Sequence, residues 1–376
     1  MKKKTVCIVC PNLAGGGVER MVLHLLLHLN RQKYKLLFVL FEKKGVYLDQ
    51  VPKDVKILCL HKKHKFSQFK IVMSLAFHVF YKIKPDIVMS FMLVPNILTL
   101  LSRCFAWHRP RVIISIRNNP DRDLQTQKMK GFKKGLMKLL YPRADGITVI
   151  SRGIKESLVQ NYGFKAENIT VVHNGVHIKQ VTTLAAERPR DDLFIHTDVH
   201  YITACGRLTL QKGFSYLIQA FRGISDATNA LLYIFGEGEE RERLTGLIHR
   251  LDMTQRIFLP GFIPNPFPYI AGSDLFILSS LYEGFGNVVV EAMACNTPVI
   301  ATDCPYGPGE IIEHGISGIL VPPGDVEKMS AAILRVMGNK ELRRSLAVEG
   351  KKRVEDFSLE RMVGGYEGVC GKLSPL

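Results

Sequence analysis

The chain has 376 residues, of which 47% are hydrophobic and 23% are charged. This composition excludes a largely disordered chain, and the length allows two domains with separate cores. The net charge of +17 is uneven, because residues 1–195 carry 34 Lys and Arg against 13 Asp and Glu, whereas residues 196–376 carry 17 against 21. The basic first half is therefore expected to meet an anionic partner, either a nucleic acid or an anionic lipid surface.

No targeting segment is expected. The apolar run after Met1 is too short for a signal peptide, and no apolar stretch is long enough to span a bilayer. The eight cysteines are scattered, and Cys7 and Cys10 have no second pair at zinc spacing. These features predict a cytoplasmic protein with reduced, buried thiols rather than a metal site.

The first half alternates short apolar runs with helical periods. A buried strand is predicted over 5–10, followed by a glycine-rich loop and by a helix whose apolar face extends from Val18 to Leu29. The further strands are predicted over 86–91, 111–116, 146–150 and 169–173. Because parallel strands need crossover connections, this order predicts a parallel sheet with helices on both faces.

The alternation weakens between His177 and Val199 and then resumes. The second series of strands is predicted over 201–205, 231–235, 257–259, 275–278, 298–301 and 318–321. We therefore predict an α/β protein with two doubly wound, Rossmann-like domains, over 1–178 and 200–357, joined by a linker over 179–199. Ligands of such folds bind at the carboxyl ends of the strands, here in a cleft between the domains.

Two segments of the first half are both amphipathic and basic. Residues 66–84 and 128–142 each mix large apolar side chains with several lysines. An ordinary surface helix with its apolar side in the core is the simpler interpretation of either segment alone. Together with the basic excess, they indicate a first domain that faces an anionic membrane surface.

Two cations stand in one loop after the predicted strand 201–205. Arg207 and Lys212 lie between Gly206 and Gly213, and a helix is predicted to follow. A guanidinium, an ammonium and a helix N-terminus together suit a diphosphate. On composition alone, two solvated loop cations explain the same residues.

The segment 282–294 holds two glutamates around a predicted helix start. If the helix begins near Asn287, its first backbone N–H groups face an anion. Glu291 would lie about one turn into the helix, where its carboxylate can accept hydrogen bonds from two ribose hydroxyls. Glu283 would lie just before the loop, next to a sugar hydroxyl or a positively charged transition state. Two unrelated surface glutamates remain the alternative.

Taken together, these motifs resemble glycosyltransferase family 4, whose members have the GT-B fold. Glu283 and Glu291, separated by seven residues, form one motif, and Gly206-Arg207-Leu208 with Lys212-Gly213 forms another. The supporting motifs are residues 15–19, 173–176, 235–238, 260–262 and 297–301. Each is weak by itself, but their order over nearly the whole chain is typical of the family.

The resemblance implies a retaining hexosyltransferase that uses a nucleotide-diphosphate sugar and needs no metal or other cofactor. Arg207 and Lys212 would hold the donor diphosphate, Glu291 would bind the ribose, and Glu283 would contact the donor sugar. The other residues implied in donor binding are Phe285, Gly286, Asn287, Val288, Gly16, Gly17, Phe262 and Ile263. The first domain would bind the acceptor, and a C-terminal helix within 358–376 would cross back to it.

The chemistry agrees with these roles. Breaking a glycosidic bond to a diphosphate builds negative charge on the leaving oxygen, which cations and a helix N-terminus stabilise. Retention without a placed nucleophile fits attack on the front face, in which the leaving phosphate accepts the proton. Glu283 as a covalent nucleophile is the alternative.

One stretch departs from the family. Many relatives carry a His shortly after the strand that corresponds to 111–116, whereas this chain has Arg117, Asn118 and Asn119 there. Arg117 is expected to take that place and bind a phosphate or a sugar hydroxyl, with Asn118 beside it in the acceptor site. A simple turn explains the two asparagines equally well.

The resemblance also implies partners. A lipid-linked saccharide acceptor, carried on a polyprenyl diphosphate at the inner face of the plasma membrane, suits the basic first half, and a UDP-hexose or UDP-N-acetylhexosamine is the expected donor. Relatives of this kind often build bacterial surface glycans such as lipopolysaccharide or capsule. The alternatives are a GT-B epimerase or phosphorylase and a basic nucleic-acid-binding protein, although no nucleic-acid recognition module is found in the sequence.

Overall fold

The computed structural model describes residues 3–60, 68–120, 129–188, 193–194, 196 and 198–373. The chain divides into two compact units, Met1–Gly175 with Glu360–Leu376, and Val176–Leu359. Each unit holds one sheet in which all paired strands are parallel. The α/β class predicted from the alternation of strands and helices is therefore confirmed.

The first unit is built on a seven-stranded sheet in the order β3-β2-β1-β4-β5-β6-β7. Its strands are β1 (Lys4–Cys10), β2 (Tyr34–Leu40), β3 (Lys56–Cys59), β4 (Ile87–Phe91), β5 (Arg111–Ile116), β6 (Gly146–Val149) and β7 (Ile169–Val171). Five of these strands match predicted ones, but β2 and β3 were not predicted. β3 is short and only half-buried, so its four residues carry little pattern before they pair with β2.

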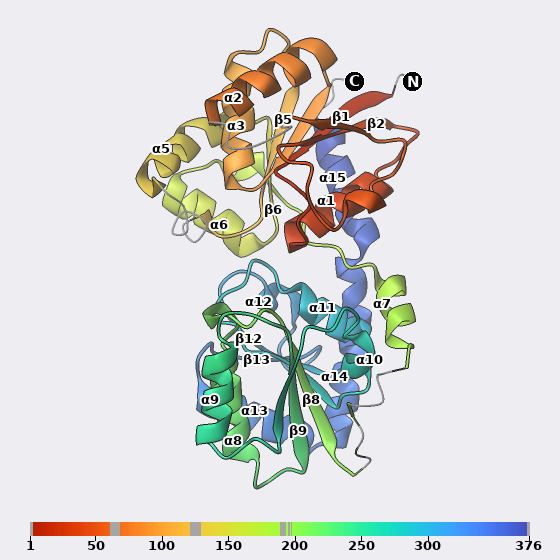
Figure 1. Cartoon of the computed structure of the whole chain (residues 1–376), viewed down its shortest axis with the longest axis vertical. Helices are drawn as coiled ribbons and strands as arrows, with labels where there is room; N and C mark the ends of the chain where they lie inside the picture. Colours follow the sequence, from red (N-terminus) through yellow and green to blue (C-terminus); the bar gives the residue numbers. More distant parts are fainter. Residues whose placement is uncertain are drawn as a thin grey trace. The chain divides into compact units, whose positions relative to one another are not determined.

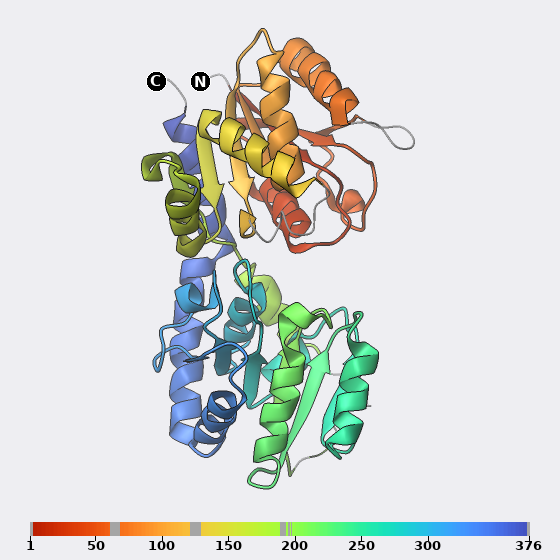
Figure 2. The same cartoon turned by 90° about the vertical axis from the view of Figure 1, so that its left-hand side faces the viewer.

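Helices cover both faces of the first sheet. Figures 1 and 2 show α2, α3 and α5 on one side of the sheet and α15 on the other. The helices of this unit are α1 (Gly17–His28), α2 (Gln68–Ser74) continued by the π-helix η2 (Leu75–Ile83), α3 (Leu93–Cys104), α5 (Lys130–Leu140), α6 (Arg152–Tyr162) and α15 (Leu359–Lys372), with short 3₁₀ turns η1 (Leu48–Gln50), η3 (Tyr141–Arg143) and η4 (Ala166–Asn168). The predicted helix around Val18–Leu29 is α1, whose buried face includes Met21, Val22 and Leu25.

The second unit is built on a six-stranded sheet in the order β10-β9-β8-β11-β12-β13. Its strands are β8 (His200–Cys205), β9 (Ala230–Phe235), β10 (Ile257–Gly261), β11 (Leu275–Leu278), β12 (Val299–Thr302) and β13 (Ile319–Val321). Alternate residues point to opposite faces, and both faces are buried. Ile202 and Ala204 of β8 join an aliphatic core, whereas Tyr201 joins an aromatic cluster with Tyr233 and Tyr269.

The helices of the second unit flank this sheet. In Figure 1, α8, α9 and α13 lie on one side of β8 and β9, and α10, α11 and α14 lie on the other. The helices are α7 (Ile178–Ala185), α8 (Phe214–Ile224), α9 (Arg241–Arg250), α10 (Phe267–Ala271), α11 (Asn287–Ala294), α12 (Pro308–Ile311), α13 (Val326–Met337) and α14 (Lys340–Arg353), with 3₁₀ turns η5 (Leu210–Lys212) and η6 (Val354–Phe357).

The segment 179–199 was predicted as a linker. Its first part belongs to the helix α7, which extends from Ile178 to Ala185. This helix packs on α10 of the second unit, and its Val181 is buried. Part of the segment, from 189 to 192 with 195 and 197, lies outside the described residues. The last helix, α15, belongs to the first unit from Glu360 onward.

The two basic amphipathic segments are helices that bury one face and expose large apolar side chains on the other. α2 and η2 bury Val72, Val79 and Phe80 but expose Phe69 and Phe77. α5 buries Met137 and Leu140 and exposes Met129, Phe132 and Leu139 at or beside it. The residues before 68 and before 129 in these segments lie outside the described ranges.

No described helix is both long and apolar enough to cross a membrane. All eight cysteines are free thiols. The prediction that all of them are buried is wrong for Cys104, which is exposed at the end of α3, and Cys59 and Cys205 are only half-buried.

Candidate functional site

In the second sheet, β9 and β10 lie on one side of β8, whereas β11, β12 and β13 lie on the other. The order in which successive strands join the sheet therefore reverses next to β8. Loops that leave the carboxyl ends of such strands diverge and leave room for a ligand. The loops after β8 and β11 are the ones that carry Arg207, Lys212 and Glu283. The fold thus places these predicted residues at the edge where doubly wound sheets bind ligands.

The loop after β8 is held against the loop after β11 by several hydrogen bonds. The Ser279 hydroxyl donates to the Lys212 carbonyl at 2.8 Å, and the Gln211 side chain donates to the Tyr282 carbonyl at 2.9 Å. Gly213 follows with φ +62°, and a Cβ there would overlap the carbonyl oxygen of Ser279. Only glycine therefore allows this approach of the two loops.

Lys212 and Glu283 form a nearly buried ion pair. The Lys212 Nζ lies 2.5 Å from Glu283 Oε1, and the Ser280 hydroxyl donates to the same oxygen at 2.6 Å. Glu283 is 8% exposed, so solvent screens this pair less than a surface pair. The sequence predicted separate ligands for the two residues, whereas the structure joins them into one unit with Ser280, a residue that the sequence did not single out.

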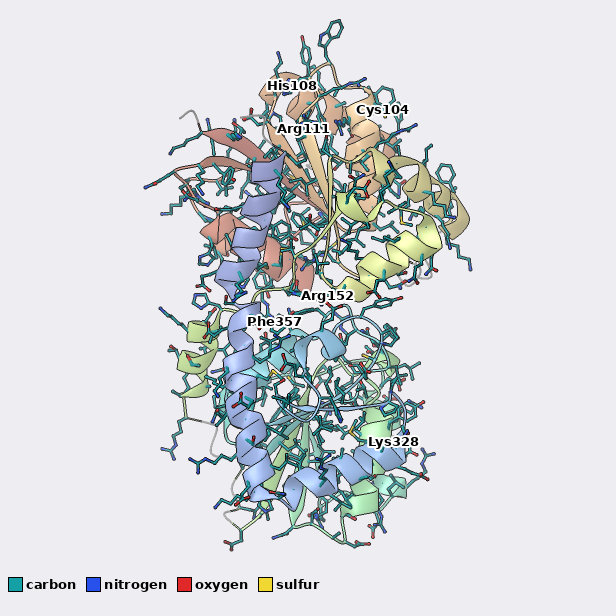
Figure 3. The ribbon with its side chains drawn as sticks, turned by 180° about the vertical axis from the view of Figure 1, so that it is seen from behind. Cys104, His108, Arg111, Arg152, Lys328 and Phe357 are labelled. Carbon is teal, nitrogen blue, oxygen red and sulfur yellow. The ribbon has the colours of Figure 1, made fainter. Side chains whose placement is uncertain are left out.

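The second glutamate lies on α11, which begins at Asn287 as predicted. Gly286 caps this helix with φ +98°, and the buried ring of Phe285 packs against Phe357, labelled in Figure 3, at 5.5 Å between ring centroids. Asn287 and Val288, in the first turn of this helix, are both half-buried. The helix therefore starts directly after the loop at the carboxyl edge of the sheet, where the positive end of a helix favours an anion.

Glu291 is buried, one turn into α11. Burial raises the pKa of the Cys205 thiol at the end of β8 to about 12, the negative charge of Glu291 adds to the shift, and the positive charge of Lys212 opposes it. The structure therefore joins Lys212 to Glu283 directly, and it places Glu291 on the helix that follows the loop of Glu283.

The remaining donor residues of the second unit differ in exposure. Arg207 is exposed, and among the described residues its side chain makes no hydrogen bond or ion pair. Phe262 is 71% exposed, whereas the neighbouring Ile263 packs against the aromatic cluster of Tyr233 and Tyr269. Arg207 and Phe262 are thus available to a ligand, and Ile263 is half-buried against the aromatic cluster.

A glycine directly after β9 packs against the loop of Arg207 at the carboxyl edge of the second sheet. Gly236 has φ +143°, and a Cβ there would overlap the carbonyl oxygen of Gly206, next to Arg207. We expect Gly236→Ala to destabilise the second unit by about 2 kcal/mol or more, since alanine is strained at this φ and the overlap moves the Arg207 loop. Urea unfolding followed by circular dichroism measures the effect. The control is Gly246→Ala in α9, where a Cβ meets no atom. Equal stability of both variants would contradict the prediction.

The glycines predicted from the first half lie at the start of α1. Gly16 is the N-cap residue of this helix, and a Cβ built on Gly17 meets no neighbouring atom. The space around Gly17 and the exposed start of a twelve-residue helix suit the approach of a ligand. These two residues follow β1, next to which the order of the first sheet also reverses.

Arg117 and Asn118 follow β5 at the same edge of the first sheet. The Arg117 guanidinium is 7% exposed; it donates from Nη1 to the Tyr366 hydroxyl at 3.0 Å and from Nη2 to the Asn174 side chain. The Asn118 side chain accepts a hydrogen bond from the Asn119 N–H at 2.9 Å, as in a local turn. Tyr366 is a further residue that the sequence did not indicate, since it lies on α15, far away in the sequence.

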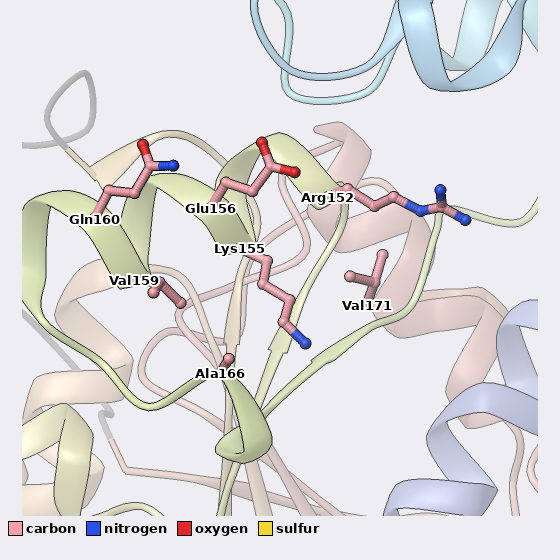
Figure 4. Close-up of a pocket in the computed structure, with 7 residues that line it drawn as sticks. All are labelled: Arg152, Lys155, Glu156, Val159, Gln160, Ala166 and Val171. Carbon is pink, nitrogen blue, oxygen red and sulfur yellow. The ribbon is translucent and has the colours of Figure 1, made fainter.

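The first unit also has a cavity of about 410 Å³ between α6 and β7. Figure 4 shows the side chains that line it, including Arg152, Lys155 and Val171. The Lys155 Nζ donates a hydrogen bond to the Ile169 carbonyl at 2.9 Å, so this amine already has a hydrogen-bond partner within the protein. None of the lining residues was predicted to bind donor or acceptor.

Two family models match this pair of parallel-sheet units to the glycosyltransferases of the GT-B class. Residues 15–180 match the model described as "Glycosyltransferase Family 4", and residues 186–353 match "Glycosyl transferases group 1". The chain belongs to glycosyltransferase family 4. These matches favour sugar transfer over the epimerase, phosphorylase and nucleic-acid-binding alternatives.

A curated relative and two solved structures extend this comparison. The chain is 28% identical over 92% of its length to the N-acetylgalactosamine-N,N'-diacetylbacillosaminyl-diphospho-undecaprenol 4-alpha-N-acetylgalactosaminyltransferase of Campylobacter jejuni, 93% of which is covered. A glycosyltransferase from Rickettsia africae has the same fold, with a TM-score of 0.85 and 20% identity over 99% of each chain. HepE of Anabaena, in complex with UDP, has a TM-score of 0.78 and 20% identity over 98% of this chain and all of its own.

Proposed function

We propose that this glycosyltransferase moves a hexose or an N-acetylhexosamine from a UDP-sugar to a saccharide carried on a polyprenyl diphosphate, with retention and without a metal. The observation that carries the proposal is the nearly buried pair of Lys212 and Glu283 between the loops after β8 and β11, with Glu291 on the helix that follows the second loop. The complex of HepE with UDP supports the choice of nucleotide. The diphospho-undecaprenol named for the Campylobacter jejuni relative supports the choice of acceptor.

The proposed roles follow from the charges around this site. Lys212, the exposed Arg207 and the start of α11 supply positive charge where a donor diphosphate would lie. That charge stabilises the leaving oxygen without a metal ion. Glu291, held one turn into α11, accepts the ribose hydroxyls. For the retaining step we propose front-face attack, because Glu283 Oε1 is already hydrogen-bonded to Lys212 and Ser280. A trapped glycosyl ester on Glu283 would replace this proposal with a covalent mechanism.

Transfer assays with a panel of UDP-, GDP- and ADP-sugars test the proposal. The assay contains a polyprenyl-diphosphate-linked sugar as acceptor, with EDTA in one arm and Mg²⁺ in another. We expect turnover with one or a few UDP-sugars, equal in both arms, and an α-linked product from an α-linked donor. Turnover only with Mg²⁺ would overturn metal independence. If no sugar is transferred and calorimetry detects no binding of any nucleotide, the donor assignment is wrong.

We further propose that the first unit docks on the anionic inner face of the plasma membrane. An aromatic face, defined as Phe69, Phe77, Tyr81, Phe105 and Trp107, is exposed on this unit. Lysines accompany it, since Lys82 Nζ lies 4.7 Å from the centroid of the Phe77 ring and Lys84 Nζ lies 6.0 Å from that of Tyr81. Aromatic rings beside lysines favour a headgroup interface.

Two contacts join the parts of this face. The rings of Phe77 and Tyr81 stack with 5.8 Å between their centroids. His108 Nε2 lies 3.3 Å from the Pro85 carbonyl, which ties the loop of Phe105 and Trp107 to the end of η2. Figure 3 labels Cys104 at the end of α3, His108 in the loop that follows and Arg111 at the start of β5. The loop and the helix therefore present their aromatic side chains from neighbouring segments.

Trp107 is the only tryptophan of the chain and is 96% exposed, so its fluorescence reports on docking directly. With vesicles that contain phosphatidylglycerol, we expect a blue shift of the emission, which is lost at high salt. Lys82→Glu with Lys84→Glu should weaken vesicle binding about 10-fold or more, since each basic residue near the surface contributes about 1 kcal/mol. Lys328→Glu with Lys352→Glu in the second unit is the matched control. A shift with duplex DNA but not with vesicles would contradict membrane docking.

A further inference from the structure

Arg117 is a buried cation without a buried counter-charge. In the described part of the chain no carboxylate lies within ion-pair distance of its guanidinium, and its Nε has no hydrogen-bond partner. The two groups that it does contact, the Tyr366 hydroxyl and the Asn174 side-chain oxygen, are neutral. Most buried arginines are paired with a carboxylate, so this arrangement is unusual for a purely structural residue.

The free energy of this arrangement is unfavourable in the absence of an anion. Burial lowers the pKa of the Arg117 guanidinium, and the nearby Tyr366 opposes part of that shift. Neutral hydrogen bonds compensate only part of the desolvation of a charge. A group that brings negative charge to this position would supply the missing compensation.

The guanidinium is fixed by segments that are far apart in the sequence. Tyr366 lies on α15 and is fully buried; its hydroxyl is 3.1 Å from the Ser115 hydroxyl, and its ring lies 6.0 Å from that of Phe91. Asn174 follows β7, at the edge of the sheet where Arg117 follows β5. Arg117 is therefore held in one orientation at the carboxyl edge of the first sheet, where this class of sheet binds ligands.

We infer that Arg117 is an anion receptor for one phosphate group, and that Tyr366 and Asn174 are positioning residues that hold its guanidinium. A guanidinium offers planar donors that match two oxygens of a phosphate, and Nε is still unpartnered. The acceptor diphosphate and the donor diphosphate are the two sources of such a group, and the choice between them rests on the proposed function.

Binding measurements on the full chain separate these sources. Farnesyl diphosphate serves as the soluble probe for the acceptor and UDP as the probe for the donor, each titrated by calorimetry into wild type, Arg117→Gln and Tyr366→Phe. We expect Arg117→Gln to weaken one of the two probes about 10-fold or more and to leave the other within about 2-fold. Loss of farnesyl diphosphate assigns the anion to the acceptor, and loss of UDP assigns it to the donor.

Tyr366→Phe keeps the ring that packs near Phe91 and removes only the hydroxyl, so it tests the receptor if Arg117→Gln does not fold. It should weaken the same probe about 3-fold or more, with little change in melting temperature. Lower melting temperatures with unchanged affinities for both probes would overturn the inference and leave Arg117 a structural link to α15. Sugar transfer by the same wild-type preparation tests the proposed function separately, because it does not depend on the variants.

Discussion

Lys212→Met is expected to lower kcat/KM for sugar transfer by about 10²- to 10³-fold, the effect typical of losing one preorganised donor to a developing oxyanion. The Lys212 ammonium is held 2.5 Å from Glu283 and belongs to a loop fixed by Ser279 and Gln211. Since its position is fixed before the donor binds, it stabilises the leaving diphosphate without reorganisation. Steady-state kinetics with the UDP-sugar found in the donor panel measure the loss.

The same substitution leaves the Glu283 carboxylate buried with only Ser280 as a described hydrogen-bond donor to its side chain. We therefore expect a loss of stability of about 2 kcal/mol, which Lys212→Met combined with Glu283→Gln should largely restore because the unpaired charge is gone. Activity should not return in the double variant. Lys352→Met, which removes an exposed lysine paired with Glu349 at 2.7 Å, is the control and should change neither quantity. Full activity of the double variant would contradict a role for Lys212 at the diphosphate.

Glu291→Ala is expected to raise the KM for the donor by about 100-fold or more and to weaken UDP binding to a similar degree. A carboxylate that accepts two hydroxyl hydrogen bonds contributes about 1.5–3 kcal/mol for each bond to a charged group. The ribose lies away from the bond that breaks, so kcat should fall much less than kcat/KM. Kinetics and UDP calorimetry on the same preparation separate the two effects.

Glu327→Ala is the matched control for Glu291, since Glu327 also lies in the first half of a helix but is exposed. Its KM and UDP affinity should equal those of the wild-type chain. If Glu291→Ala binds UDP with unchanged affinity, Glu291 does not contact the ribose. In that case the burial of its side chain has another cause.

Much of the fold could be predicted because long buried strands carry a strong local signal. The bounds of β5, Arg111–Ile116, and of β11, Leu275–Leu278, are the ones predicted from the sequence. β3 is different, because its register is set only by pairing with β2. The valines Val288–Val290 favour a strand by propensity, yet they are helical, since Gly286 turns the chain and α11 packs against the sheet.

The charges of the site were readable from the sequence, but their partners were not. The spacing of Glu283 and Glu291 and the glycines around Arg207 led to the prediction of a diphosphate site, because those residue types act locally in loops and at helix ends. Ser280 and Tyr366 carry no such local signal. Tyr366 meets Arg117 only because α15 packs on the first sheet.

The sequence by itself therefore determined the class of fold and the family, and it named the residues that we propose to bind a nucleotide-sugar, because periodicity, turn chemistry and motif spacing act over short stretches of chain. Only the tertiary structure decided which of these residues interact. It joined Lys212 to Glu283 and Ser280, and it left Arg117 as a buried cation between Tyr366 and Asn174. The burial and pairing of a charged side chain depend on segments that are distant in the sequence. Both determine the direction of its pKa shift and its contribution to the free energy of folding.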